Sequence, residues 1–377
     1  MTTPPLDGIR VVELAQMVAG PGTGLLLADY GAEVIKIEPP GGEGARQLKS
    51  PTVLDIDPSP VFSAYNRNKS LVTADLRDET DRAEVLRLCK DADVVLTSSR
   101  PGVMERLGLG YRDLKTINPM VVYAAVTGFG DGPLGQSRGG VDLLVQAESG
   151  LMSTTGELGG QPLKVGFTVV DAATAHALTH GILAALLRRA RTGVGEYVAI
   201  SLYDVAVQLQ TGPIAEFLHS SEQTPRLGNS APFSAPADLF RCSDMDIVLS
   251  AYLPHHWLAL LECLGLPELA GDERFATGSA RSRNRQELSG LLAEVFATRT
   301  ASQWLTELSG RGILAAPVQD HAAVVASPLT EERQLLVDTD DLKAVTTPVT
   351  MSELPTPRHA ETLGSVRDVR WEGEHNE

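Results

Sequence analysis

A strand–helix–strand pattern in the first forty residues constrains the fold most. Residues Ile9 to Leu14 (IRVVEL) and Glu33 to Glu38 (EVIKIE) are short apolar runs rich in β-branched side chains, and Thr23 to Asp29 between them has helical character. Two strands joined through a helix form a βαβ unit, and such a crossover makes the two strands parallel. This arrangement excludes all-helical and all-antiparallel folds for this part of the chain.

The same alternation continues for about two hundred residues. Further strand patterns lie at 70–76, 93–96, 121–126 and 196–201, and helix patterns lie at 79–90 and 172–191. The last helix has a basic final turn and Gly193 directly after it, which is a typical C-terminal signal. Strands that alternate with helices predict an α/β fold with a mostly parallel sheet covered on both faces.

From about Ser220 the composition changes, because Pro225, Gly228, Pro232 and Pro236 crowd together as in a linker. A strand pattern at 247–251 follows, with helix patterns at 257–263, 286–296 and 301–308. At roughly 150 residues per domain, 377 residues suggest about two domains. The second is predicted as a small α+β domain.

The charge balance excludes several classes of partner. The net charge is −16 and the pI about 5.0, so a face that tracks nucleic-acid phosphates is not expected. Cys89, Cys242 and Cys263 show no CxxC spacing, which favours packed thiols in a reducing compartment. The chain shows neither a signal-peptide pattern nor an apolar run of membrane-spanning length, so we expect a cytoplasmic protein with no membrane partner.

Two motifs have a structural interpretation that outweighs the functional one. The segment AGPGTG, Ala19 to Gly24, suggests a dinucleotide loop, but the third glycine of that fingerprint is replaced by Leu25, which favours a close backbone approach. His176 and His180 have the spacing of two metal ligands, yet no third ligand is nearby in sequence, so no metal site is predicted.

Asp171 is the most ambiguous residue. It lies between the apolar run 165–170 and an alanine-rich helix, where an aspartate is well suited to cap the helix N-terminus. A carboxylate at a strand-to-helix junction is also well placed for chemistry at the ligand-binding edge of an α/β sheet. Local physics favours the cap but does not separate the two roles.

Three basic residues are also open to two interpretations. Lys69, Arg100 and Arg106 are candidates either for binding a phosphorylated ligand or for ordinary surface charge.

Longer segments resemble the family III CoA-transferases, which include formyl-CoA transferases and α-methylacyl-CoA racemases. The resemblance covers nearly the whole chain in the family's order. It rests on LDGIRVVEL with AGP (6–21), LLLADYGAEVIKIEPPGG (25–42), NRNKSLVTADL (66–76), RPGVMERLGLGY (100–111), VTGFGDGP (126–133), GILAALLRRARTGVGEYVAISLYD (181–204) and GILAAPV (312–318).

The resemblance implies a fold and a site. It implies that Asp171 is the nucleophile of an acyl-CoA:carboxylate CoA-transferase, which acts through a mixed anhydride and an aspartyl-CoA thioester, with Asp142 as a possible support and coenzyme A as substrate. The residues expected at CoA are Met17, Val18, Ala19, Lys69, Ser98, Ser99, Arg100, Arg106 and Leu107.

The family pattern is not matched everywhere. Thr97, Ser98 and Ser99 replace the Glu-Asn-Phe found in many members, and the stretch 228–236 (GNSAPFSAP) replaces the glycine-rich loop of formyl-CoA transferases. Val141 stands where the racemases have a histidine; because valine cannot carry a proton, CoA transfer is favoured over racemisation. A racemase and a non-catalytic CoA-binding protein remain the alternatives.

We therefore predict a Rossmann-like large domain built from both chain ends. Its N-terminal part is 1–200, followed by a linker helix and loop at 201–225, the small α+β domain at 226–327 and a return segment at 328–377. The resemblance further implies a homodimer in which two ring-like subunits interlock.

Overall fold

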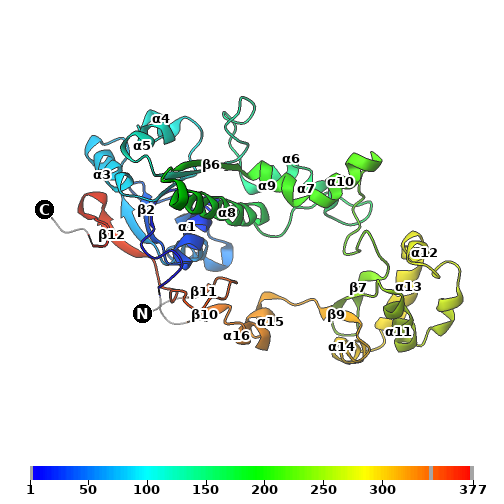
Figure 1. The fold of residues 1–377 in the computed structure, drawn as a ribbon. Helices are drawn as coiled ribbons and strands as arrows, with labels where there is room; N and C mark the ends of the chain where they lie inside the picture. The colour runs from blue at the N-terminus through cyan, green and yellow to red at the C-terminus, as the bar shows by residue number, and fades with distance from the viewer. Residues whose placement is uncertain (1–2, 339–342, 374–377) are drawn as a thin grey trace. The chain divides into compact units, whose positions relative to one another are not determined.

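The computed structural model describes residues 3–338 and 343–373, which form two compact units (Figure 1). The first contains the described residues of Met1–Leu151, Lys164–Ser221 and Leu329–Glu377, and the second contains Met152–Leu163 and Glu222–Pro328.

A parallel sheet is the centre of the first unit. Its strands in the described residues are β1 (Arg10–Leu14), β2 (Glu33–Glu38), β3 (Ser70–Thr73), β4 (Val94–Thr97), β5 (Val122–Thr127), β6 (Glu196–Ser201) and β12 (Glu361–Ser365). Their order is β12-β3-β2-β1-β4-β5-β6, and every adjacent pair is parallel. This is the doubly wound Rossmann order 3-2-1-4-5-6, with β12 from the far end of the chain added at one edge. The predicted α/β class with a parallel sheet is confirmed.

Two apolar layers cover the sheet because successive strand residues face opposite sides. On one face, Val11 and Leu96 pack against α1 (Ala19–Asp29) and α8 (Val169–Thr192). On the other, Val12 and Val95 pack against α3 (Glu79–Lys90) and Trp371 near the C-terminus. By length and composition α8 would pass as a membrane span, yet one side of it is buried against α1 and the sheet.

Shorter elements complete the first unit. They are α2 (Pro60–Asn66), α4 (Val103–Arg106), α5 (Tyr111–Ile117), α6 (Asp142–Glu148), α9 (Leu202–Leu209), α10 (Thr211–Ser220), β10 (Leu336–Asp338), β11 (Lys343–Val345) and short 3₁₀ turns at Gly44–Gln47, Pro51–Val53 and Val366–Asp368. Two helices, α7 (Leu151–Thr154) and α16 (Pro328–Glu332), lie where the chain passes between the units.

The second unit has an antiparallel sheet with helices. Its elements are β7 (Ala237–Arg241), β8 (Asp246–Ser250), β9 (Leu314–Pro317), α11 (Pro254–Leu264), a 3₁₀ turn at Pro267–Gly271, α12 (Gly278–Arg283), α13 (Arg285–Phe296), α14 (Ala301–Gly310) and α15 (His321–Val325). In its core, the ring of Phe296 packs at a tilt against Phe240 and edge-to-face against Trp304.

The units differ from the predicted boundaries most in two places. Residues 152–163, predicted in the large domain, belong to the second unit, where Arg226 donates hydrogen bonds to the carbonyls of Ser153 and Gly160. The first part of the predicted linker, 201–221, belongs to the first unit, because Leu202 and Ala206 of α9 are buried in its core.

The AGPGTG segment is helix, not loop. Helix α1 begins at Ala19, four residues before the predicted start, and its glycines allow close packing. A Cβ at Gly22 would lie 2.9 Å from the Cβ of Ala175 on α8, and a Cβ at Gly24 would lie 1.9 Å from a carboxylate oxygen of Glu13. The predicted close backbone approach is confirmed.

Candidate active site

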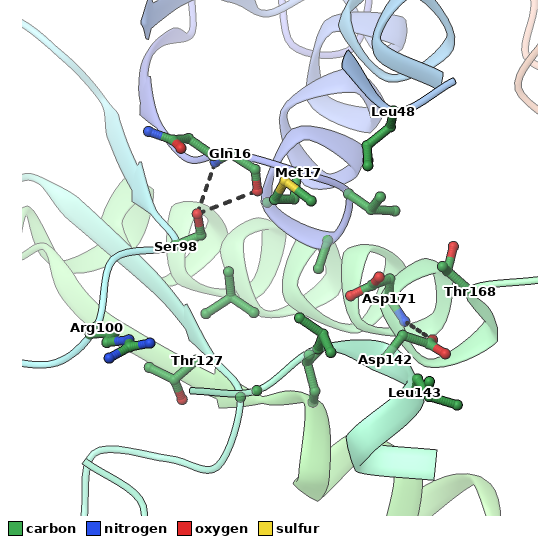
Figure 2. Close-up of a pocket in the computed structure, with 18 of the residues that line it drawn as sticks. Gln16, Met17, Leu48, Ser98, Arg100, Thr127, Asp142, Leu143, Thr168 and Asp171 are labelled. Atoms are coloured by element: carbon green, nitrogen blue, oxygen red, sulfur yellow. Dashed lines mark hydrogen bonds between the residues drawn. The ribbon is translucent and has the colours of Figure 1, made fainter. Parts of the chain in front are cut away.

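A pocket of about 820 Å³ opens at the carboxyl ends of β1, β4 and β5, entirely within the first unit (Figure 2). In the strand order, the chain goes from β1 to β2 in one direction along the sheet and from β4 to β5 in the other. The pocket between β1 and β4 therefore lies at a topological switch point. Ligands of open α/β sheets bind in this crevice. Gln16 and Met17 line it from the β1 side, Ser98 from the β4 side, and Asp171 from α8.

Asp171 occupies the third position of α8. The interpretation of Asp171 as the N-cap is wrong, because Thr168 holds that position and makes no side-chain capping bond. The run 165–170 is not a strand either: it enters the helix from an irregular segment. Asp171 is therefore free to present its carboxylate to the pocket, while another residue satisfies the backbone at this helix end.

That residue is Asp142, the first residue of α6, which is 6 % exposed. Its Oδ2 accepts hydrogen bonds from the backbone N–H of Val170 at 2.8 Å and of Asp171 at 3.2 Å. Its Oδ1 accepts a bond from the amide of Gln146, whose own oxygen accepts one from the N–H of Val165 at 2.9 Å. A distant carboxylate thus caps α8, and Figure 2 shows it beside Asp171.

The electrostatics of the two carboxylates favour chemistry at Asp171. Burial, and secondarily the negative charge of Asp142, raise the pKa of Asp171 to about 7. A strongly raised carboxyl pKa in a pocket is a mark of functional sites, and a desolvated carboxylate is a stronger nucleophile than one in water. Burial raises the pKa of Tyr65 on α2, and the negative charge of Asp171 adds to this rise.

The β1–α1 connection forms the opposite wall. Met17, Val18 and Ala19, which were predicted to contact CoA, line the pocket, and Met17 adopts a left-handed backbone conformation with φ of 73°. Among the residues that the structure describes, no side chain caps the N-terminus of α1, so its first N–H groups are left for a ligand. The positive end of a helix dipole favours anions and developing negative charge.

Ser98, Ser99 and Arg100, also predicted CoA contacts, line the same pocket. The Ser98 hydroxyl accepts a hydrogen bond from the N–H of Gln16 at 2.8 Å and thereby ties the β4 loop to the β1 loop (Figure 2). The guanidinium of Arg100 is exposed and forms no ion pair with any residue that the structure describes, so it can meet an anionic ligand.

Three predicted CoA contacts lie elsewhere. Lys69 is completely buried, and its ammonium is bonded to Glu13, Asn66 and the carbonyl of Pro21. Its charge suggested a ligand contact, but sequence does not reveal burial. Arg106 is exposed and Leu107 half-buried at the end of α4, and neither lines the pocket.

Several lining residues are not indicated by any sequence pattern, among them Gln16, Leu48, Lys164 and Phe167. Gln16 could have been found because it directly precedes the predicted Met17. The others lie in irregular segments that have no recognisable sequence pattern. His176 and His180 are exposed on α8, outside the lining. Within 3–338 and 343–373, no group of three or more His, Cys, Asp or Glu side chains is arranged to hold a metal ion.

Comparison with known proteins identifies the family. The model of CoA-transferase family III matches residues 6–364. The chain belongs to this family. It is 40% identical to a probable fatty acyl-CoA transferase of Mycobacterium tuberculosis, over 99% of this chain and 96% of that one. It is 37% identical to succinyl-CoA:mesaconate CoA-transferase of Haloarcula hispanica, over 93% and 91% of the two chains.

A solved structure gives the same result. A CaiB/BaiF family protein from Brucella suis superposes with a TM-score of 0.88 at 36% identity, covering 96% of this chain and 97% of that one. The enzyme is thus a family III CoA-transferase, as predicted, and its substrates are CoA thioesters.

Proposed function

We propose that this enzyme moves CoA from an acyl-CoA donor to an acceptor carboxylic acid, with Asp171 as the nucleophile. The observation that carries the proposal is a desolvated carboxylate, with a pKa of about 7, in the switch-point pocket of a family III CoA-transferase. The family gives the reaction class, and the pocket supports the choice of residue.

The proposed reaction has four steps. The Asp171 carboxylate attacks the donor thioester, and the C–S bond breaks to give a mixed anhydride and CoA thiolate. The thiolate attacks the aspartyl carbonyl, which releases the donor acid and leaves an aspartyl-CoA thioester. The acceptor carboxylate displaces CoA from this thioester as thiolate, giving a second anhydride. The thiolate then attacks the acceptor's acyl carbon and restores the Asp171 carboxylate.

The surrounding groups have matching roles in this proposal. The uncapped N–H groups at the start of α1 would stabilise the oxyanions of the tetrahedral intermediates. Apolar lining residues such as Val18 and Leu202 would pack against the pantetheine arm, and Arg100 would pair with a CoA phosphate. A second cavity shares Leu14, Gln16 and Ser99 with the pocket and gives the nucleotide end of CoA room to extend.

Racemisation fits the site less well. It requires two bases on opposite faces of the α-carbon. Val141 lines the pocket where the racemases have their histidine, and the neighbouring Asp142 carboxylate is engaged by three hydrogen-bond donors.

Trapping tests the function. The protein is incubated with succinyl-CoA or with a fatty acyl-CoA, the donor classes named for the two relatives, and examined by intact mass spectrometry. We expect a gain of one CoA less one water, which hydroxylamine removes, and peptide mapping should place the resulting hydroxamate on Asp171. Free CoA, which carries no acyl group, should give no adduct. A hydroxamate on another residue, or α-carbon deuterium exchange without any adduct, would contradict the proposal.

We also propose that the enzyme is a homodimer with interlocked subunits, as the family resemblance implies. Helix α10 buries none of its residues, and its Phe217 and Leu218 are 48 % and 75 % exposed. Large apolar side chains that are exposed to water next to one another on a helix favour a protein–protein contact. Sedimentation velocity should give a mass of about twice the 40.2 kDa of one chain, whereas a monomer mass would refute the proposal.

A further inference from the structure

Four charged side chains are buried together beneath the pocket. Glu13, Lys36, Glu43 and Lys69 have exposed fractions of 0 %, 0 %, 3 % and 0 %. Lys36 pairs with Glu13 at 2.9 Å and with Glu43 at 2.7 Å, and Glu13 pairs with Lys69 at 2.8 Å. The two lysines and two glutamates thus form one charge-balanced network.

The network also holds the backbone of the β1–α1 connection and the first turn of α1 at three points, each through a different side chain. Lys36 donates to the carbonyl of Ala15 at 2.8 Å, Glu43 accepts from the N–H of Met17 at 2.6 Å, and Lys69 donates to the carbonyl of Pro21 at 2.8 Å. These contacts lie before, within and after the segment 16–20 that lines the pocket.

The segment needs such support. A non-glycine residue with positive φ, such as Met17, persists only where its surroundings hold it. The sequence leaves room for the network as well, because any side chain at Gly24 would overlap the Glu13 carboxylate.

Stability alone does not explain four buried charges. The desolvation of buried ions commonly cancels their mutual attraction, and an apolar set of similar volume is often at least as stable. Apolar side chains, however, cannot bond the carbonyls of Ala15 and Pro21 or the N–H of Met17. The feature that the network adds is therefore the fixed geometry of the pocket wall.

We propose that this network is a positioning device for CoA, and that Glu43, through Met17, is its decisive contact. The inference rests on the proposed function, in that the segment 16–20 is taken to bind CoA. Glu43 is a positioning residue, because it lies behind the wall and touches no substrate.

The test compares variants of Glu43 with a matched buried ion pair. Glu43→Gln replaces the charge-assisted bond to the Met17 N–H by a weaker neutral one and loses the charge that pairs with Lys36, and Glu43→Leu removes both contacts. The control is Asp29→Asn at the other end of α1: Asp29 pairs with Arg67 at 2.6 Å, and both side chains are at most 5 % exposed. Among the described residues, Asp29 bonds with Arg67 and Asn68, and no hydrogen bond or ion pair joins it to the segment 16–20.

Isothermal titration with CoA gives the first measurement. We expect the Kd for CoA to rise about tenfold for Glu43→Gln, the equivalent of one lost charge-assisted hydrogen bond, and further for Glu43→Leu. Asp29→Asn should bind CoA as the wild type does, although it too breaks a buried pair. Equal affinities for wild type and both Glu43 variants, or an equal loss in Asp29→Asn, would overturn the inference.

Two further measurements separate positioning from general destabilisation. Amide hydrogen exchange should become faster in the peptide around Met17 for the Glu43 variants and remain slow there for Asp29→Asn. For a donor that wild type uses, KM should rise in Glu43→Gln while kcat stays near the wild-type value. If Glu43→Leu does not fold, Glu43→Gln still decides the question. A wild type without CoA affinity would refute the proposed function itself, and this inference with it.

Discussion

Replacing Asp171 with alanine should abolish transfer while CoA binding is retained. In the proposed mechanism every covalent intermediate forms on the Asp171 carboxylate, so its removal leaves no alternative route. Loss of a catalytic nucleophile typically lowers kcat by 10³-fold or more, and we expect about 10⁴-fold here. The measurement is exchange of a labelled acid into its own CoA thioester, which requires no knowledge of the natural acceptor.

The matched control is Asp171→Asn, which keeps the shape of the side chain and cannot form the thioester. The folded-state pKa of Asp171, about 7, lies above its ordinary value of 3.8, so ionising this carboxyl costs the native state stability as pH rises from about 4 to 7. The asparagine variant escapes that cost. It should be inactive yet more stable than wild type at pH 8, by on the order of 1–3 kcal/mol, with no difference below pH 4. Residual transfer within tenfold of wild type would show that Asp171 is not the nucleophile.

The sheet was predictable because its strands are buried on both faces. Such strands appear as short continuous apolar runs, so β1, β2, β4 and β5 lie within one residue of their predicted positions. Helix α8 was predicted nearly to its ends, since Gly193 after a basic turn marks its C-terminus.

The errors have physical causes of a different kind. The glycines of Ala19 to Gly24 indicated a loop, since their contacts with Ala175 and Glu13 come from other elements. The charge of Lys69 suggested a ligand, because its two carboxylate-bearing neighbours in space, Glu13 and Glu43, are distant in sequence. In both cases the deciding interaction is long-range, and no local pattern carries it.

In the candidate site, too, the residues differ in whether the sequence indicates their role or a long-range contact determines it. Asp171 was singled out through the family resemblance, whereas local physics favoured a capping role for it. The structure gives that capping role to Asp142, 29 residues earlier in the chain, which a sequence pattern does not predict. The separation leaves Asp171 free for chemistry and makes Asp142 the natural second target.

Two substitutions of Asp142 should separate its effect on the pH dependence of activity from its effect on the rate. In Asp142→Asn, a neutral side chain that can still accept a backbone bond, the repulsion that contributes to the raised pKa of Asp171 is removed, while the larger effect of burial remains. The nucleophile is the ionised form, so activity falls as pH drops through the Asp171 pKa. The acid limb of kcat/KM against pH should therefore move about one pH unit lower. Near pH 5.5 the variant should keep a larger fraction of its own maximal activity than the wild type keeps of its maximum.

Asp142→Leu separates charge from geometry. It removes the same negative charge and also the acceptor for the N–H groups of Val170 and Asp171, so the start of α8 loses its anchor. We expect the same acid shift together with a kcat about 10²-fold lower, the usual cost of a misplaced reacting group. Because the two variants share the electrostatic change, any difference in their kcat at pH 8 measures positioning alone. An unchanged acid limb in both variants would mean that Asp142 acts on Asp171 through the helix backbone and not through its charge.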